Sequence, residues 1–529
     1  MNPEAKSGGK GILRNTAIVG AMTALSRVMG LVREMFQSRL IGAGVEQSAF
    51  VLAFAIPNMM RKLFGEGALT AAFVPVFRGE VEAQRMESAR RLARAVMTMS
   101  LLMLAAVSAL AVVGLSAALH WGTAFSERTS LTLRLTRILV PYMVFICGSA
   151  FGMGVLNALG KFAAAALMPC LLNVVWIATL GVLCFIPGMS LASRAMWVSG
   201  AILFAGFLQM AFMFWCMKRR GVSPRPSRAG WGDPNTRLVW RNMLVAAVGA
   251  GAVQINYMLD QVLAQAASPW AAGVIGYAER LMDLPLGIVG VAFGTVLLPT
   301  FSGCFAKGDV AGAREAFLSS TDNLLFVMIP AAVGLGVIAP DLTRVIYEGK
   351  EFDVTATIRV SRAVACYAVG LGFFGLQKTL VPWFQAQKDM KTPLAVSVKM
   401  VFLNATLNIL AVWLLPVEWR HVGLAASTVF CASVACVWLA VLARRKNGAL
   451  GFVSLARPVG RTLAASAVMG VVLWLVRSWL GTRGWTGTWA NVMQLGTLVA
   501  LGGVVYFGVH FIFARHTFAA RLRSLRRRR

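Results

Sequence analysis

Long apolar runs dominate the chain, and short polar turns separate them. Each run is long enough to cross a bilayer, which takes about 20 helical residues. Because only helices and closed barrels satisfy their backbone in lipid, the pattern predicts an all-α, polytopic membrane protein of about 14 transmembrane helices. The runs fall at about 14–41, 47–77, 93–120, 130–158, 162–186, 192–217, 238–267, 270–304, 317–339, 357–386, 392–415, 421–443, 459–480 and 488–514.

Two segments of the chain recur about 224 residues later. Gly67–Phe77 aligns with Val291–Phe301, and Asn157–Pro169 aligns with Phe384–Pro393. Both halves keep the same loop charge, which predicts a parallel duplication of six helices. The predicted domains are an N-lobe at 1–217, a cytoplasmic linker at 218–237, a C-lobe at 238–445, and a C-terminal helix pair with a basic tail at 446–529.

Composition agrees with a membrane protein. Hydrophobic residues make up 58% of the chain and charged residues 14%, which excludes an ordinary soluble domain. In a soluble protein the net charge of +30 would favour nucleic acid, but Lys and Arg gather here in alternate loops. The positive-inside rule places these loops and both termini in the cytoplasm. We therefore predict a membrane partner and no nucleic-acid partner.

Permanent positive charges lie inside the runs. Arg27 and Arg61 lie in the first two runs and Arg280 in the eighth. A charge at mid-membrane costs at least about 2.5–3.5 kcal/mol, so such residues usually face a watery cavity. The planar guanidinium suits phosphate. The pattern therefore predicts a cavity between the lobes that binds a lipid-linked anion, best a diphosphate, with structural ion pairing as the alternative.

Acidic residues in the same runs are predicted to act as gate or ion-pair partners. Glu34 follows Arg27 by seven residues, which is two helical turns on nearly the same face. Asp283 lies one turn after Glu279, and Glu66 lies in the second run. For Glu66 and Glu279, simple pairing with a nearby arginine is the alternative.

A second polar group predicts a candidate sodium site. Asp260 lies within the seventh run, Asn404 and Asn408 lie one turn apart in the eleventh, and Thr428 lies in the twelfth. These are hard oxygen ligands that suit a small cation. The alternative is that Asp260 accepts hydrogen bonds from the two amides. Apart from Na⁺ we predict no cofactor.

Enzyme signatures are missing from the sequence. There is no GxxxxGK[ST] loop for ATP, and the four histidines lack the spacing of a metal site. Two lobes around a charged cavity are typical of a transporter. We therefore predict a transporter and no enzyme.

Four segments resemble the MurJ/MviN family, whose members are lipid II flippases of the multidrug/oligosaccharidyl-lipid/polysaccharide superfamily. They are Ser26–Met35, Pro57–Phe77, Tyr277–Pro299 and Tyr347–Asp353. The similarity runs over nearly the whole chain. The resemblance implies the following cavity arginines and acidic neighbours: Arg27, Arg33, Arg61, Arg280, Glu34 and Glu279.

Two positions depart from the family. Asp283 stands where the family often has Glu, which is a mild change. Ser48 stands where the family commonly has an acidic residue, so any gate contact assigned to that carboxylate is in question here.

We expect a flippase that moves the undecaprenyl-diphosphate-linked peptidoglycan precursor, lipid II, for cell-wall synthesis. It would move the lipid from the cytoplasmic to the periplasmic leaflet of the bacterial inner membrane by alternating access, driven by membrane potential or an ion. The alternative is an exporter of another polyprenyl-linked saccharide, of the O-antigen or teichoic type. A cation or drug antiporter would need a carboxylate-dominated cavity in the first lobe. Cell-wall synthesis proteins are further expected partners.

Overall fold

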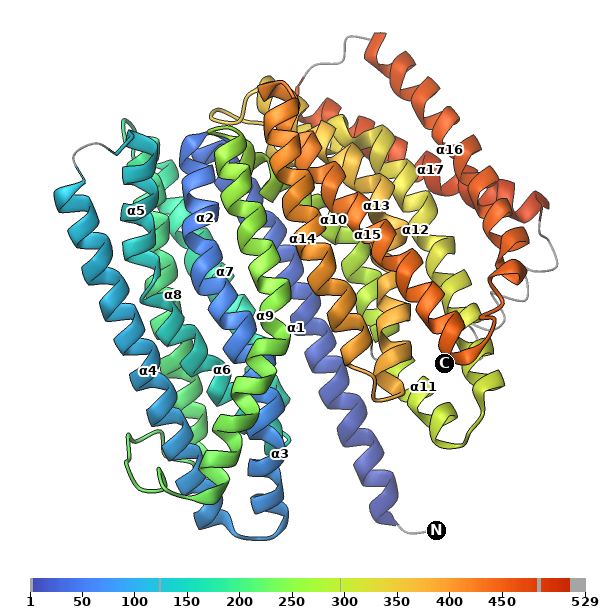
Figure 1. Ribbon diagram of the computed structural model, residues 1–529. Coiled ribbons are helices and arrows are strands. Elements are labelled where there is room, and N and C mark those ends of the chain that lie inside the picture. Colours follow the sequence, from blue (N-terminus) through green and yellow to red (C-terminus); the bar gives the residue numbers. More distant parts are fainter. Residues whose placement is uncertain (1–2, 123–124, 295, 483–486, 514–529) are drawn as a thin grey trace. The chain divides into compact units, whose positions relative to one another are not determined.

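The structure is a computed structural model that describes residues 3–122, 125–294, 296–482 and 487–513. The described residues form helices joined by turns, without a strand (Figure 1), which confirms the predicted all-α class. Within these ranges, the side chains outside the description are those of residues 3–18, 65–68, 70, 248–250, 252–253 and 288–294.

Contacts divide the chain into two compact units, each described here by itself. Unit 1 comprises Met1–Gln265 together with Gly349–Phe352, and unit 2 comprises Ala266–Glu348 and Asp353–Arg529. The predicted domain boundary at 218–237 rests on the sequence repeat and stays a prediction.

Unit 1 is built from helices that lie side by side (Figure 1). Helix α1 packs against α7, α6 against α8, and α2 against α5. One core gathers around Phe73 and Phe151, and a second around Phe50 and Trp176. The elements are α1 (Pro3–Ile41), α2 (Val45–Met60), η1 (Arg61–Ala68), α3 (Leu69–Glu82), α4 (Met86–Trp121), α5 (Glu127–Leu139), α6 (Tyr142–Ala158), α7 (Phe162–Cys184), α8 (Leu191–Arg219) and α9 (Pro234–Ala267).

Unit 2 centres on α12 and α13, which pack against each other. The buried Trp383 on α13 meets the rings of Phe301 and Phe317. Helix α16 packs on α12, where Arg477 forms an ion pair with the buried Asp341. The elements are α10 (Ala271–Gly294), α11 (Leu297–Ala306), α12 (Val310–Tyr347), α13 (Val354–Ala386), α14 (Lys391–Leu414), α15 (Val417–Asn447), η2 (Phe452–Leu455), α16 (Ala456–Thr482) and α17 (Thr488–Phe513).

Side chains mark the starts of several helices. Ser190 accepts a hydrogen bond from the Ser193 amide at 3.2 Å and caps α8. Asp353 accepts one from the Ala356 amide at 2.7 Å and caps α13. These caps satisfy backbone N–H groups that a helix leaves unpaired in its first turn.

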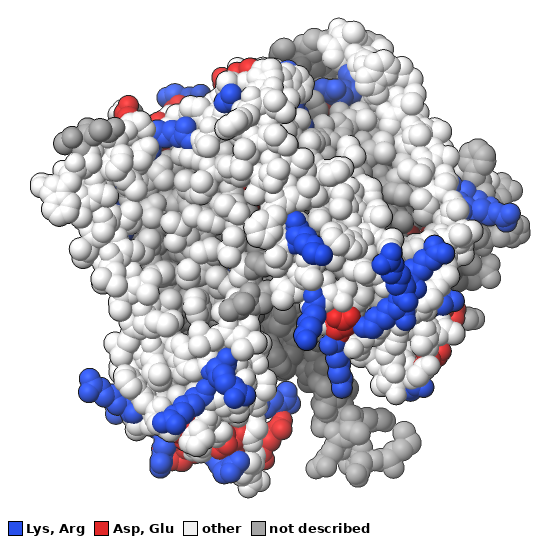
Figure 2. All heavy atoms as spheres, viewed as in Figure 1, with Lys and Arg blue, Asp and Glu red and all other residues white. Residues whose placement is uncertain are grey.

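Ten helical segments of the described chain are long and apolar enough to cross a membrane. Each of the fourteen predicted runs overlaps a helix, but those at 14–41, 47–77, 238–267 and 270–304 are outside the ten, so the number fourteen stays a prediction. In Figure 2 the charged side chains of unit 1 gather toward the two ends of its helices. Leu110 of α4 is 73% exposed. The protein is therefore a multi-pass membrane protein.

The second predicted run is one continuous helical stretch with a π-helix in its middle. Helix α2 passes directly into η1 at Arg61, and η1 passes into α3 at Leu69. A π-turn accommodates an extra residue and is frequent at functional sites. This feature was not predicted, and it begins at one of the predicted cavity arginines.

The segment Gly349–Phe352 packs within unit 1 although its chain neighbours belong to unit 2. Arg194 of α8 donates to the Leu40 carbonyl at 2.9 Å and pairs with Glu351 at 3.2 Å. Gly42, between α1 and α2, has a φ of +77°, and a Cβ there would lie 2.2 Å from the Glu351 carbonyl oxygen. The close approach of the segment therefore requires glycine at position 42.

Candidate functional site

Arg33 on α1 is held by three partners within unit 1. Its Nη1 donates to Oδ1 of Asn173 at 3.1 Å, and its Nη2 pairs with Glu34. Its guanidinium carbon lies 4.3 Å from the centroid of the Trp176 ring. Asn173 and Trp176 lie on α7, so the packing of α1 on α7 positions this arginine. The Nε of Arg33 is buried without a partner in the described structure, which leaves one donor unused.

Asn173 is a site residue that the sequence interpretation missed. Besides Arg33, it contacts Ser26, to whose carbonyl its Nδ2 donates at 3.1 Å. One amide thus fixes two points of α1, roughly two helical turns apart. The only signal in the sequence is an amide inside the apolar run 162–186.

Arg61 lies at the start of η1 and is half-buried. Its Nε and Nη2 both donate to Oδ1 of Asn58, at 3.2 and 3.1 Å. On the side of Arg33, the Phe54 ring centroid lies 5.8 Å from that of Trp176 and 6.2 Å from that of the buried Tyr142. Arg33 therefore lies at the end of a group of aromatic rings.

Arg27 lies elsewhere on α1 and is exposed. It lines a cavity of about 280 Å³ between α1 and the α6–α7 connection. Glu34 was expected near Arg27, but it pairs with Arg33, because two turns of helix separate residues 27 and 34 by about 10 Å. Among the described side chains, no carboxylate forms an ion pair with Arg27.

The predicted residues of unit 2 lie together on α10. Arg280 and Asp283 are exposed, and Glu279 is half-buried. Glu279 and Asp283 are one turn apart and share a face. Pro285 follows within the same helix and lacks the N–H that would bond to the Leu281 carbonyl. Arg280 belongs to unit 2 and the other three arginines to unit 1, so their joint action stays a prediction.

Two predicted gate positions have different outcomes. Ser48 on α2 is fully buried, next to Gln47, whose side-chain oxygen accepts a hydrogen bond from Gln37 at 3.0 Å. These two buried glutamines were not predicted. Glu66 lies outside the described side chains.

The predicted sodium ligands fall in both units. In unit 2, the Ser427 hydroxyl contacts Oδ1 of Asn404 at 3.0 Å and Oδ1 of Asn408, and all three residues are buried. Thr428 instead donates to the Leu424 carbonyl of its own helix.

Asp260, the fourth predicted ligand, is in unit 1. Its Oδ2 accepts a hydrogen bond from Nδ2 of Asn256 at 3.1 Å.

In unit 2, the amide and hydroxyl oxygens that converge around Ser427 fit a hard cation. No cluster of three or more His, Cys, Asp or Glu is found among the described residues.

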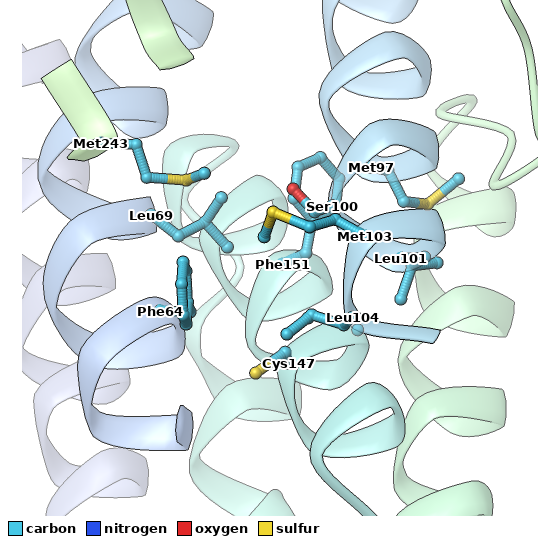
Figure 3. A pocket seen from close by; sticks show the side chains of 11 residues that line it. Phe64, Leu69, Met97, Ser100, Leu101, Met103, Leu104, Cys147, Phe151 and Met243 are labelled. Atoms are coloured by element: carbon cyan, nitrogen blue, oxygen red, sulfur yellow. The ribbon is translucent and has the colours of Figure 1, made fainter. Parts of the chain in front are cut away.

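Two other cavities differ in what they can hold. The cavity in Figure 3 lies beside η1, and its lining includes Phe64, Leu69, Met97 and Cys147. Its volume of about 20 Å³ has room for little more than one water. It is therefore too small for a substrate group.

The second is an apolar cavity of about 500 Å³ in unit 2. Helices α10, α12, α16 and α17 line it, with side chains that include Leu284, Phe326, Met469 and Tyr506. Its size and lining match a pocket for a small apolar ligand or part of a hydrocarbon chain.

Comparisons with known proteins agree in one family. The profile of the family described as "Lipid II flippase MurJ" matches residues 37–495. The chain is 32% identical to "Probable lipid II flippase MurJ" of Rhizobium tropici, over 98% of this chain and 97% of that one. It is 31% identical to "Lipid II flippase MurJ" of Burkholderia cenocepacia, over 95% and 97% of the two chains. The fold is similar to the solved structure "Lipid II flippase MurJ, inward closed conformation", with a TM-score of 0.76, 21% identity, and coverage of 95% of this chain and 100% of that one.

Proposed function

The chain belongs to the MurJ lipid II flippase family, and we propose that its arginines hold the diphosphate of lipid II while the lipid crosses the bacterial inner membrane. In this proposal the lipid moves from the cytoplasmic to the periplasmic leaflet by alternating access, with both termini in the cytoplasm. The observation that carries it is that Arg33 and Arg61, inside long apolar runs of the sequence, are each held by a neighbouring amide.

The chemistry of unit 1 supports an anionic ligand. Asn173 holds Arg33, which lies over the Trp176 ring, and Asn58 holds Arg61. Arg27 lines a cavity and has no carboxylate partner among the described side chains. A guanidinium stays ionised and binds phosphate oxygens in pairs. Arg280 of unit 2 supplies the fourth cation of the proposed set.

The apolar cavity of unit 2 supports a ligand with a hydrocarbon chain. Its lining by α12, α16 and α17 offers a surface for part of the prenyl tail. Because a prenyl tail already lies in hydrocarbon when it is in the bilayer, such a surface would hold it by packing contacts rather than by removal from water.

Sodium coupling is a separate part of the proposal. Asn404, Asn408 and Ser427 would supply neutral oxygens, and Asp260 would supply the charge that neutralises the ion. Ser427 takes the place that the sequence interpretation gave to Thr428. Comparing transport in Na⁺ and in choline, for wild type and Asp260→Asn, tests this part. Equal transport rates of the wild type in the two salts would show that the protein has no such sodium site.

Arginine-to-lysine substitutions test the main proposal. Arg27→Lys, Arg61→Lys and Arg280→Lys keep the charge but lose the fork, which costs about 1.5–3 kcal/mol per charged hydrogen bond. We expect each variant, as the sole copy, to flip lipid II at least about ten-fold more slowly and to let it accumulate on the cytoplasmic side.

The control is Arg78→Lys, which changes an exposed ion pair with Glu82 and should leave growth normal. Normal growth of both Arg27→Lys and Arg280→Lys would contradict the proposal. Accumulation of a different lipid-linked saccharide on depletion would favour the alternative exporter of an O-antigen or teichoic unit. Cell-wall synthesis enzymes that use the flipped lipid are the proposed protein partners.

A further inference from the structure

The segment Gly349–Phe352 between α12 and α13, which we call the strap, is a stiff turn on a fixed base. Its first and last residues exchange two backbone hydrogen bonds, at 3.1 and 3.3 Å. Before the strap, Tyr347 of α12 is buried and donates its hydroxyl to the Tyr277 carbonyl of α10 at 3.3 Å. Glu348 accepts a hydrogen bond from the Thr357 hydroxyl of α13 at 2.9 Å. The strap therefore has little slack relative to α12 and α13.

The tip of the strap is held on unit 1 by an ion pair. Glu351 lies 3.2 Å from Arg194 of α8, and their side chains are 23% and 11% exposed. The same nitrogen of Arg194 donates to the Leu40 carbonyl at 2.9 Å. If Glu351 leaves, Arg194 keeps the carbonyl as a partner, and the partly exposed carboxylate gains water. The pair can therefore open without leaving a buried charge unpaired, which is the main cost of breaking such a pair.

The strap rests on the helix that carries Arg33. A Cβ added to Gly349 would lie 3.1 Å from the Cβ of Arg39, in the last turn of α1. Arg39 and Leu40 follow Arg33 by about two helical turns, or about 10 Å along the axis. A movement of α1 that accompanies anion binding at Arg33 would therefore reach the strap.

We propose that the strap is a releasable latch. It is docked on unit 1 in the state described here, and Glu351 separates from Arg194 once in each transport cycle. The proposal rests on the proposed function, because alternating access requires two states that differ in their contacts. A turn with little slack cannot stretch, so a movement of α12 and α13 away from the end of α1 must pull Glu351 off Arg194. A permanent clasp, the alternative, would keep this contact in every state.

A disulfide that holds the strap in place tests the latch. In Arg39→Cys/Gly349→Cys the two Cβ atoms would start 3.1 Å apart, near the separation of about 3.5–4.5 Å in a disulfide. Gly349 has no positive φ, so a side chain is tolerated there. We expect the full-length double variant in liposomes to flip lipid II when reduced and to lose flipping when copper phenanthroline oxidises the pair. Dithiothreitol should restore flipping.

A longer linker is the matched control. A long, flexible bis-maleimide modifies the same two cysteines but leaves the strap free to move, so flipping should persist. Loss of flipping with both linkers would assign the effect to modification of the two positions and would overturn the latch. Normal flipping by the oxidised variant, with the disulfide verified by mass spectrometry, would overturn it too. A wild type that does not flip lipid II in the same liposomes would overturn the proposed function instead.

Release of the strap can also be measured without lipid II. Gly349 packs against position 39, so the rate at which a maleimide labels Arg39→Cys reports how often the strap leaves unit 1. Removing the ion pair in Glu351→Gln should raise this rate about five-fold, the value of one hydrogen bond. Glu82→Gln, which removes an exposed ion pair with Arg78, should leave it unchanged. Equal labelling rates in these two variants, read at position 39 by mass spectrometry, would overturn the latch.

Discussion

At the scale of single residues, neighbours decide what each arginine can do. Asn173 and Glu34 hold Arg33 on α1, while Asn58 holds Arg61 from the preceding turn of α2. A restrained guanidinium loses less conformational entropy when it binds an anion. The amide side chains of Asn173 and Asn58, which hold the two guanidinium groups, therefore belong to the site as much as the charges do.

Replacing Asn173 tests this role. Asn173→Leu removes the acceptor of Arg33 and the donor to the Ser26 carbonyl, at similar side-chain volume. Because a hydrogen bond to a charged group contributes about 1.5–3 kcal/mol, we expect lipid II flipping to fall about ten-fold or more. Assays of flipping and of lipid affinity check it.

The matched control is Thr179→Val, on the same helix, whose hydroxyl bonds only to the Val175 carbonyl in the described structure. It should behave as wild type. If Asn173→Leu flips lipid II at the rate of Thr179→Val, Asn173 does not position the site.

Residue types were predictable from the sequence, but their partners were not. A charge inside an apolar run is visible locally, and so Arg27, Arg33, Arg61 and Arg280 could be named. The bond from Arg33 to Asn173 joins positions 140 apart in sequence, which no local pattern specifies.

The sequence also did not predict which residues of a helix face the neighbouring helix. Asn404 and Asn408 were assigned to one face correctly, since four residues make about one turn, and both contact the same hydroxyl. Which residue of α15 faces them depends on how two helices pack, and Ser427 does so instead of Thr428. One residue along a helix turns a side chain by about 100°.

At the scale of elements, apolar periodicity located the helices but not their irregularities. Each predicted run overlaps a helix, yet the π-helix η1 and the break between α5 and α6 at Pro141 were not predicted. Both depend on a balance between backbone geometry and packing. A run of apolar residues records only that the segment is buried or faces lipid.

The turn between α1 and α2 gives an element-scale prediction. In Gly42→Ala, the positive φ alone costs about 1–2 kcal/mol, and the new Cβ would lie 2.2 Å from the Glu351 carbonyl oxygen. We expect a lower thermal midpoint and increased proteolysis at Gly349–Phe352, because the segment must move away from α1. Differential scanning fluorimetry and limited proteolysis measure both effects.

Gly20→Ala is the control for Gly42→Ala, since a Cβ at position 20 meets nothing within 4 Å. Alanine inside a helix should leave stability unchanged or raise it by up to about 1 kcal/mol. Equal midpoints for the two variants would show that the segment does not depend on glycine at position 42.

At the scale of the whole molecule, charge and hydropathy carry most of the information. The multi-pass class follows from composition, because runs of this length and polarity are stable only in lipid. The repeat predicted two lobes, and contacts define two units, but α9 lies mostly in unit 1 by contacts and in the C-lobe by sequence. A sequence repeat shows which segments arose by duplication, whereas contacts show where a helix packs in one conformational state.

Orientation in the membrane is the last prediction. Basic residues gather in the predicted linker Lys218–Arg237, which packs on unit 1 where the Ser227 amide donates to Thr98 at 3.0 Å. The positive-inside rule places this linker in the cytoplasm, and it places the segment containing Lys350 on the other side. Both Arg228 and Lys350 are exposed, so cysteines at these positions can react with a maleimide.

The labelling should be done in a Cys184→Ser background, because Cys184 is the exposed native cysteine at the end of α7. A membrane-impermeant maleimide should label Lys350→Cys in intact spheroplasts and Arg228→Cys only after the membrane is opened. The reverse labelling would mean that the orientation in the membrane is opposite to the predicted one. Arg27 would then first meet the lipid from the other side of the membrane. Labelling of both positions in intact spheroplasts would mean that the linker is not cytoplasmic, because a segment shielded by the membrane cannot react.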